Sequence, residues 1–239
     1  MPIIPQHRLV FQHLPRTGGN AICKAFNVSS DGHLHLQRYQ QLVEKNHPDI
    51  SISEWTTFTI IRDPVQRFKS AWKTILYPPD EQMENQDIKT LRRKYWDQLF
   101  KYDNINDFVQ KLTSNFELRD EFFVDPCSYH FWPLASFCTA RVDVRAHVVA
   151  SKTMDPRKLQ LVRPGFVLKF EQLEEDFRLL TKMINIDDYD LPVINNTSAT
   201  DKSAELSDDT TALLETLYGH DYEICHQLLS AHHLPLFFN

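Results

Sequence analysis

The sequence predicts an α/β fold whose mainly parallel central sheet is flanked by helices. Short segments rich in β-branched and aromatic residues alternate along the chain with longer segments whose apolar residues recur at helical spacing. The short segments carry few charges, which is typical of strands covered on both faces. A chain of 239 residues, 42% of them hydrophobic, can bury a large core without disulfides or metals. We therefore expect one domain over residues 1–239.

The first predicted strand lies near the N-terminus. An extended apolar segment over residues 9–14 predicts it, and Pro15 and a pair of glycines end it. Apolar residues at helical spacing then predict a short helix over 21–26 and a second helix over 36–45. Residues 57–61 are β-branched or aromatic and predict a central strand.

A helix is expected directly after this central strand. Pro64 suits the first turn of a helix, and Asp63 can cap its free amide groups. Apolar residues continue at helical spacing on one face, which makes the segment amphipathic. Further helices are expected near 88–101 and 105–113.

The second half of the chain continues the alternation. Strands are expected at 147–150 and 166–169, and the second leads into a helix over 173–184. One or two packing helices are expected over 213–228. Because sheets of this kind bind ligands at the carboxyl ends of their strands, the residues that follow the strands are the place to look for a site.

Composition excludes several classes of function. The net charge of −6 argues against a surface that binds nucleic acid, which needs a surplus of lysine and arginine. The four cysteines form no C-x-x-C pair, which argues against a zinc ribbon or a thioredoxin-type site. We expect buried thiols, with a disulfide between Cys127 and Cys138 as the alternative.

The glycine pair is a candidate phosphate-binding turn. Glycine is rare here, with five in 239 residues, yet Gly18 and Gly19 adjoin directly after the first strand. A strand, a glycine turn and a helix N-terminus present free backbone N–H groups, which bind phosphate. The spacing matches neither a Walker A loop nor G-x-G-x-x-G, so a tight turn with an incidental Arg16 stays open. We expect His13 to pack beneath this loop.

A second basic segment follows the central strand. Residues 62–73 contain four basic residues and one acid within an acidic protein. Helical spacing places Arg67 and Ser70 on neighbouring turns, so that they and Arg62 can converge on a second phosphate. The alternative is a solvated basic helix face.

The two segments together resemble the nucleotide motifs of sulfotransferases that use 3′-phosphoadenosine 5′-phosphosulfate. His-Leu-Pro-Arg-Thr-Gly-Gly-Asn at 13–20 resembles their 5′-phosphosulfate loop, and Arg-Asp-Pro-x-x-Arg-x-x-Ser at 62–70 resembles their 3′-phosphate motif. The order and spacing are most similar to the carbohydrate branch, of heparan and chondroitin type, and its bacterial relatives. Residues 167–177 and 217–222 add to the resemblance, which thus spans almost the whole chain.

The resemblance implies a P-loop-like three-layer fold and metal-free transfer of a sulfuryl group to the hydroxyl of a glycan or small molecule. It implies a 3′-phosphate site at Arg62 and Ser70. It also implies a 5′-phosphosulfate site at Arg16, Thr17, Gly18, Gly19 and Asn20. The family usually has lysine where this chain has Arg16. Arginine keeps the charge, but it is bulkier and cannot donate a proton.

The acceptor hydroxyl needs a general base, and histidine is best matched to neutral pH. His33-Leu34-His35 resembles the H-x-H segment of heparan 2-O-sulfotransferases, whose second histidine is the base. We therefore expect His35 to be the base, assisted by His33, while Arg16 stabilises charge on the transferred group. His130 is a further candidate for an acceptor or base role. Surface histidines in a polar loop are the alternative.

Two other functions stay open at this point. A nucleotide-dependent phosphotransferase can use similar loop geometry, although the sequence has neither the end of a Walker A motif nor an evident magnesium-binding aspartate after a strand. The second alternative is a nucleotide-binding protein that has lost sulfuryl transfer because of Arg16. The sequence determines neither the acceptor nor the oligomeric state.

The sequence also bears on location. No segment approaches the roughly 20 apolar residues that a membrane span requires. The N-terminus lacks the basic and then apolar pattern of a secretory signal. We therefore expect a cytoplasmic protein of bacterial type, or the Golgi lumen if the chain is trimmed from a eukaryotic relative.

Overall fold

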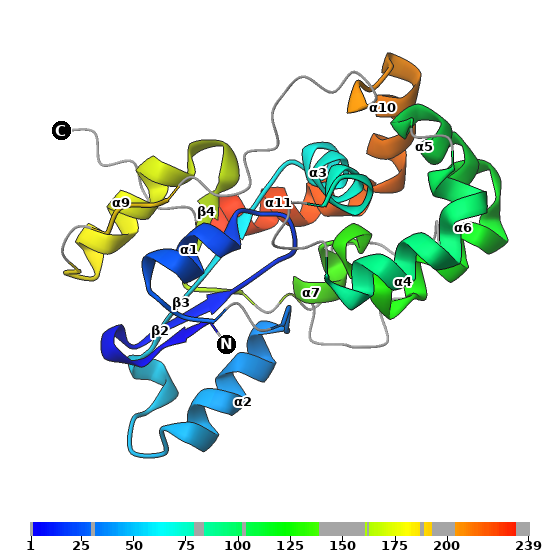
Figure 1. Cartoon of the computed structure of the whole chain (residues 1–239). Coiled ribbons are helices and arrows are strands. Elements are labelled where there is room, and N and C mark those ends of the chain that lie inside the picture. The colour runs from blue at the N-terminus through cyan, green and yellow to red at the C-terminus, as the bar shows by residue number, and fades with distance from the viewer. Residues whose placement is uncertain are drawn as a thin grey trace.

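The computed structural model describes residues 2–29, 32–78, 84–101, 104–138, 161, 163–186, 189–192 and 204–232. Its sheet has four strands in the order β1 (Ile3–Ile4), β2 (Leu9–Gln12), β3 (Thr56–Ile61) and β4 (Phe166–Lys169). The pair β1 and β2 is antiparallel, whereas β2, β3 and β4 run parallel (Figure 1). The predicted mainly parallel sheet is therefore confirmed.

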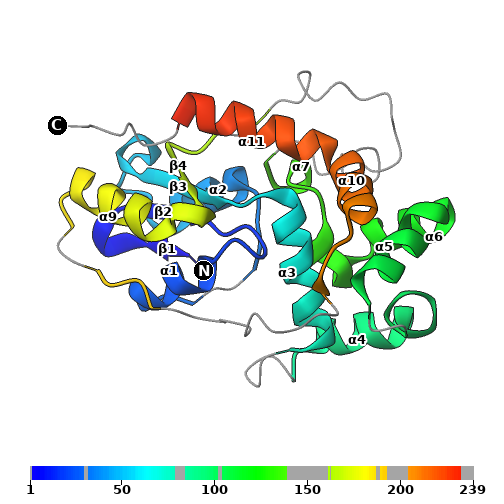
Figure 2. The same cartoon turned by 90° about the horizontal axis from the view of Figure 1, so that it is seen from above.

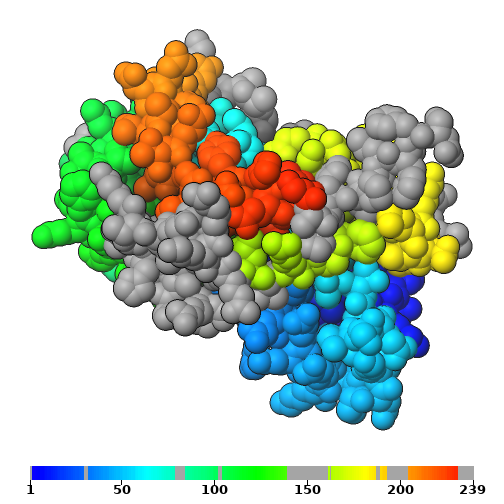
Figure 3. Space-filling view, turned by 180° about the vertical axis from the view of Figure 1, so that it is seen from behind, coloured from blue at the N-terminus to red at the C-terminus, as the bar shows by residue number. Residues whose placement is uncertain are grey.

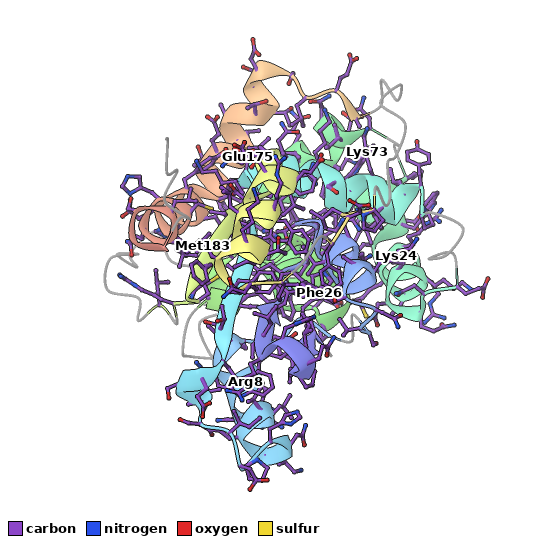
Figure 4. The ribbon with its side chains drawn as sticks, turned by 90° about the vertical axis from the view of Figure 1, so that its left-hand side faces the viewer. Arg8, Lys24, Phe26, Lys73, Glu175 and Met183 are labelled. Atoms are coloured by element: carbon purple, nitrogen blue, oxygen red, sulfur yellow. The ribbon has the colours of Figure 1, made fainter. Side chains whose placement is uncertain are left out.

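Helices cover both faces of this sheet and complete three layers (Figures 1 and 2). On one face, α1 (Gly19–Ala25) and α9 (Leu173–Met183) pack against apolar side chains of β2, β3 and β4. Phe26, which follows α1, contacts Phe177 of α9 with ring centroids 5.7 Å apart, and Figure 4 labels Phe26 at this place. The α/β prediction with flanking helices is thus confirmed.

The opposite face is covered at two places. There α2 (Leu36–Asn46) packs through Tyr39 against Val10 of β2. The C-terminal helix α11 (Gly219–His232) packs against Val167 of β4. Seen from behind, α11 extends from α10 (Asp208–Leu217) across to β4 (Figure 3). The sheet therefore lies between α1 and α9 on one side and α2 and α11 on the other.

The helix α3 (Pro64–Leu76) leads the chain from the end of β3 into the largest apolar core of the described residues. Asp63 caps it by accepting from the backbone of Gln66 at 2.9 Å, as predicted. Figure 2 shows α3 between the sheet and a group of helices. That group is α4 (Gln86–Tyr95) with a π-helical turn (Trp96–Phe100), α5 (Ile105–Ser114), α6 (Phe116–Val124) and α10 (Asp208–Leu217).

Short helical segments connect these elements. They are η1 (Pro5–His7), η2 (Ile52–Glu54), η5 (Pro126–Phe131), α7 (Ala135–Cys138) and η7 (Phe170–Gln172). The sequence did not predict β1, because two residues carry no alternation, nor α6, whose apolar residues do not gather on one face. The strand expected at 147–150 lies outside the described residues.

Two further expectations concern cysteines and membranes. All four cysteines are free thiols, so the alternative of a disulfide between Cys127 and Cys138 is wrong. Cys23 and Cys138 are buried, as expected, while Cys127 and Cys225 are half-buried. Within the described ranges, no helix is long and apolar enough to cross a membrane.

Candidate active site

A cleft of about 1280 Å³ opens where the parallel strands end. His13 follows β2, Arg62 follows β3 and Phe170 follows β4, and all three residues line the cleft. Parallel strands place their carboxyl ends on one edge of the sheet, which brings together segments that are far apart in the sequence. The expected position of the site is therefore the position of the cleft.

The loop between β2 and α1 is held in a tight and partly left-handed conformation. Arg16 has a φ of 65° and Gly18 a φ of 84°. The buried Thr17 side chain donates to the carbonyl oxygen of Leu14 at 2.9 Å and closes the turn. A Cβ atom on Gly18 would lie 3.0 Å from the ring of Phe170, so the glycine also permits close packing against η7. Left-handed residues are a feature of the backbone concavities that bind anions.

Gly19 is required by the ring beneath the loop. A Cβ atom at this position would lie 2.1 Å from Cδ2 and 2.3 Å from Nε2 of His13. The His13 ring is 5% exposed and stacks on Phe11 with ring centroids 5.5 Å apart. His13 therefore packs beneath the loop, as the sequence predicted. Burial, followed by the charges of His33 and Arg16, lowers the pKa of His13 well below 6.5.

The two basic segments meet at the cleft. Arg16 donates from Nε and Nη2 to the hydroxyl oxygen of Ser70, at 3.2 and 3.1 Å. Arg62 donates from Nη1 to the backbone oxygen of Arg16 at 3.3 Å, and its guanidinium lies 4.0 Å from the centre of the Phe170 ring. Arg16, Arg62 and Ser70 therefore form one cationic wall.

The electrostatics of this wall favour an anion. Burial, and then the charge of Arg62, lowers the pKa of Arg16 to about 10. Burial also lowers the pKa of Arg62, against the opposing effect of Glu171 and Asp63. Each guanidinium thus loses solvation beside another cation, and a bound anion would compensate both losses.

The expectation that Arg67 converges on the same anion is wrong. Its side chain is fully buried and is not among the residues that line the cleft. It donates to the backbone oxygens of His130 and Trp132 and pairs with Asp221 at 3.5 Å. Sequence spacing could not reveal this, because Asp221 lies 154 residues further along the chain.

His33 is the histidine of the H-x-H segment that lines the cleft. Its Nδ1 lies 2.8 Å from the backbone oxygen of His13. A carbonyl oxygen only accepts hydrogen bonds, so Nδ1 carries the hydrogen and Nε2 carries the lone pair. Burial lowers the pKa of His33 to about 4, with the hydrogen bond to His13 opposing and Arg16 adding to the decrease. The ring is therefore neutral at pH 7.

Aromatic rings surround His33. Its ring centroid lies 5.1 Å from Tyr129, 6.2 Å from His130 and 4.5 Å from His13. Burial, and then the charge of Arg16, lowers the pKa of His130 well below 6.5. Burial raises the pKa of Tyr129 to about 12. This part of the cleft is thus a wall of uncharged rings next to the two guanidinium groups.

Most of the residues singled out from the sequence line the same cleft. They are Arg16, Gly18, Gly19, Asn20, His33, Arg62, Ser70 and His130. Thr17 and His35 are not among the described residues that line it: the Thr17 hydroxyl closes the turn, and His35 lies at the N-terminal end of α2.

Sequence reasoning missed Tyr129 and Phe170 as residues of the site. Phe170 directly follows a predicted parallel strand, and this position could have indicated that it lies at the site. Tyr129 gave no such signal, because it lies in a short 3-10 segment without periodicity.

The arrangement suits one class of chemistry. Arg16 and Arg62 can hold an anionic group, and a neutral imidazole with a free lone pair lies in the same cleft. Such a pair of features can stabilise a negatively charged donor and remove a proton from an attacking hydroxyl.

Comparison with known proteins bears on this chemistry. A family model described as "Sulfotransferase family" matches residues 2–225. No curated protein and no solved structure matches the sequence. The family match includes both basic segments, the H-x-H segment and every strand of the sheet. The chain therefore belongs to the sulfotransferase family, whose members transfer a sulfuryl group to an acceptor.

Proposed function

We propose that this protein transfers the sulfuryl group of 3′-phosphoadenosine 5′-phosphosulfate to a hydroxyl of a carbohydrate or a small molecule. One observation carries the proposal. Arg62 and Ser70 lie 46 and 54 residues after Arg16 in the sequence, and all three residues meet in one cleft beside a neutral histidine. Family membership supports sulfuryl transfer in general, and the cleft supports a donor that carries several negative charges.

The residues of the cleft fit this co-substrate. Its 5′-phosphosulfate would lie at Arg16 and at the turn of Gly18, Gly19 and Asn20, to which Thr17 contributes its backbone N–H. Its 3′-phosphate would lie at Arg62 and Ser70. Burial and the charge of Arg62 depress the pKa of Arg16, and an anion bound between the two guanidinium groups would relieve this effect. When bound, the co-substrate supplies the sulfuryl group.

Arg16 holds its place through Ser70. Both hydrogen bonds from Arg16 end on the Ser70 hydroxyl oxygen, so the guanidinium plane is oriented before any ligand arrives. A delocalised cation with several donors can follow negative charge from the transferred group to the departing phosphate. Arginine is therefore able to take the position at which the family usually has lysine.

We assign the general base to His33 in place of His35. His33 lines the cleft, and its Nε2 carries the lone pair that a hydroxyl proton needs. Its pKa of about 4 makes it a weak base without ligands. Because Arg16 contributes to that decrease, an anion bound at Arg16 would raise the pKa of His33 and strengthen it as a base. His130 would then line the acceptor side.

Binding is tested by calorimetric titration with 3′-phosphoadenosine 5′-phosphate, with ATP and magnesium as the comparison. Micromolar binding of the first and not of the second is expected, and Arg62→Ala should abolish it. Preferred binding of ATP with magnesium would support the phosphotransferase. Tight binding without turnover on any acceptor would support a nucleotide-binding protein that has lost transfer.

The base is tested with a matched pair of variants. His33→Gln should lower kcat by two to four orders of magnitude while the affinity for 3′-phosphoadenosine 5′-phosphate stays within threefold. His35→Gln is the control and should keep kcat within a few-fold of wild type. Transfer is followed with sulfur-labelled co-substrate and a panel of sugar hydroxyl acceptors. If kcat falls in His35→Gln and not in His33→Gln, His35 is the base and the assignment of His33 is wrong.

A further inference from the structure

The wall of the cleft at residues 130–134 is held by side chains from distant elements. Arg67 of α3 donates to the backbone oxygens of His130, at 3.3 Å, and Trp132, at 2.6 Å. Tyr218 donates from its hydroxyl to the backbone oxygen of Phe131 at 2.6 Å. The chain here has left regular helix, so these side chains supply the hydrogen bonds that a helix would otherwise provide.

Asp221 of α11 completes this arrangement. One of its carboxylate oxygens accepts from the backbone N–H of Leu134 at 2.8 Å, and the other pairs with Arg67 at 3.5 Å. Arg67 and Asp221 are both 0% exposed, and Tyr218 is 1% exposed. Four backbone groups between 130 and 134 are thus fixed by three buried side chains.

Stability alone does not explain a buried ion pair. Removing two charges from water costs several kcal/mol per ion, and well-packed apolar side chains of similar size often stabilise a fold as well or better. Burial raises the pKa of Asp221 to about 6, which reflects that cost. What the pair provides is fixed geometry, because a guanidinium and a carboxylate accept only a narrow range of partner positions.

The fixed geometry connects both sides of the cleft. The helix that carries Arg67 begins two residues after Arg62, and Ser70, three residues after Arg67 on the same helix, lines the cleft. The side chains of His130 and Trp132 line the cleft as well. In Figure 2, α3 runs from the sheet towards α4, and α11 extends from α10 to β4.

We propose that Arg67, Tyr218 and Asp221 form a buried clamp that fixes the wall at residues 130–134 relative to the anion-binding residues of α3. They are positioning residues: none of them lines the cleft, and they act through the backbone of residues 130–134. In the proposed function, the clamp sets the distance between the acceptor side and the sulfuryl donor. This last consequence rests on the proposed function, whereas the clamp itself does not.

The mildest variant is Tyr218→Phe, which keeps the ring and removes one hydroxyl. It should lower kcat about tenfold, the effect of one lost hydrogen bond, and leave the affinity for 3′-phosphoadenosine 5′-phosphate within twofold. Tyr95→Phe is the matched control. Its hydroxyl is also buried, but it donates to Asp125, which keeps Lys94 as a partner, and kcat should not change.

A second variant removes the ion pair as a whole. Arg67→Met combined with Asp221→Leu leaves no unpaired buried charge, whereas the backbone groups of His130, Trp132 and Leu134 lose their partners. The clamp predicts that this variant still folds, with a lowered Tm, and loses kcat at least tenfold at a temperature at which circular dichroism shows it folded. If kcat is unchanged in both this variant and Tyr218→Phe, the clamp does not position the acceptor side.

A measurement without turnover tests the clamp by itself. Burial, and then the charge of Arg16, keeps the pKa of His130 low, so a loosened wall should hydrate the ring and raise that pKa towards 6.5. Proton NMR titration of the histidine ring signals measures this in Tyr218→Phe and wild type. An unchanged His130 pKa in every clamp variant would overturn the clamp. A raised His130 pKa in a protein without sulfuryl transfer would instead overturn the proposed function and leave the clamp intact.

Discussion

Replacing Gly19 by alanine tests the contact between the loop and the His13 ring. A Cβ atom at position 19 would lie 2.1 Å from His13 Cδ2, and real Cβ atoms essentially never come within 3.0 Å of such a neighbour. The ring would therefore have to move by about 1 Å, the difference between these distances. It is buried and stacked on Phe11, so little room is available.

The magnitude follows from this overlap. Forcing an extra methyl group into a well-packed site costs roughly 1–3 kcal/mol. For a chain of this size, each kcal/mol lowers Tm by roughly 2–4 °C. Gly19→Ala should therefore lower Tm by several degrees, and nucleotide affinity should fall as well because Gly19 lines the cleft in the proposed phosphate-binding turn. Circular dichroism melting and titration with 3′-phosphoadenosine 5′-phosphate measure the two effects.

Gly219→Ala is the matched control, because a Cβ atom there has nothing within 4 Å. Alanine favours the first turn of α11 and should stabilise the protein by about 0.4–1 kcal/mol. Gly19→Ala with a wild-type Tm and wild-type nucleotide affinity would refute the reasoning. A double variant that also carries His13→Ala should recover part of the lost stability, because the overlap is then gone.

The remaining predictions concern three other side chains. Arg62→Lys keeps the charge but loses the planar contact with Phe170, so calorimetry should find nucleotide binding about tenfold weaker; equal affinity would contradict this. Asp63→Ala removes the cap of α3 and the partner of Tyr222, and urea unfolding should show a loss of about 1–2 kcal/mol. His33 has a pKa of about 4 in the folded protein against 6.5 unfolded. Below pH 6.5 the unfolded state takes up the proton first, so this histidine costs about 3 kcal/mol of stability as the pH falls from 6.5 to 4. The loss should be smaller in His33→Gln, and identical pH profiles of the two proteins would oppose the assignment.

Local patterns determined most of the secondary structure. The strand predicted at 166–169 is β4, and the helix expected after Pro64 is α3, capped by Asp63 as predicted. These features depend on neighbours within a few residues, which the sequence displays directly. The family was also accessible from the sequence, because its two motifs are contiguous segments, and the family match confirmed it.

The place of the site was predictable for a topological reason. Parallel strands place their carboxyl ends on one edge, so the segments that follow residues 9–14 and 57–61 had to approach each other. The structure brings them into hydrogen-bonding distance through Arg16 and Ser70. The sequence could not specify this particular bond, because the choice of partner depends on side-chain directions in the folded chain.

Only the tertiary structure decided which members of each motif face the cleft. It places His33 and not His35 on the cleft, and it turns Arg67 inward to Asp221 and the backbone of 130–132. Sequence spacing distinguishes neither the two histidines nor the direction in which the Arg67 side chain turns, because the outcome depends on packing against elements up to 154 residues away. Burying a charge is compensated only where distant residues supply an opposite charge or hydrogen bonds. A local sequence pattern does not show where those residues lie in the folded chain.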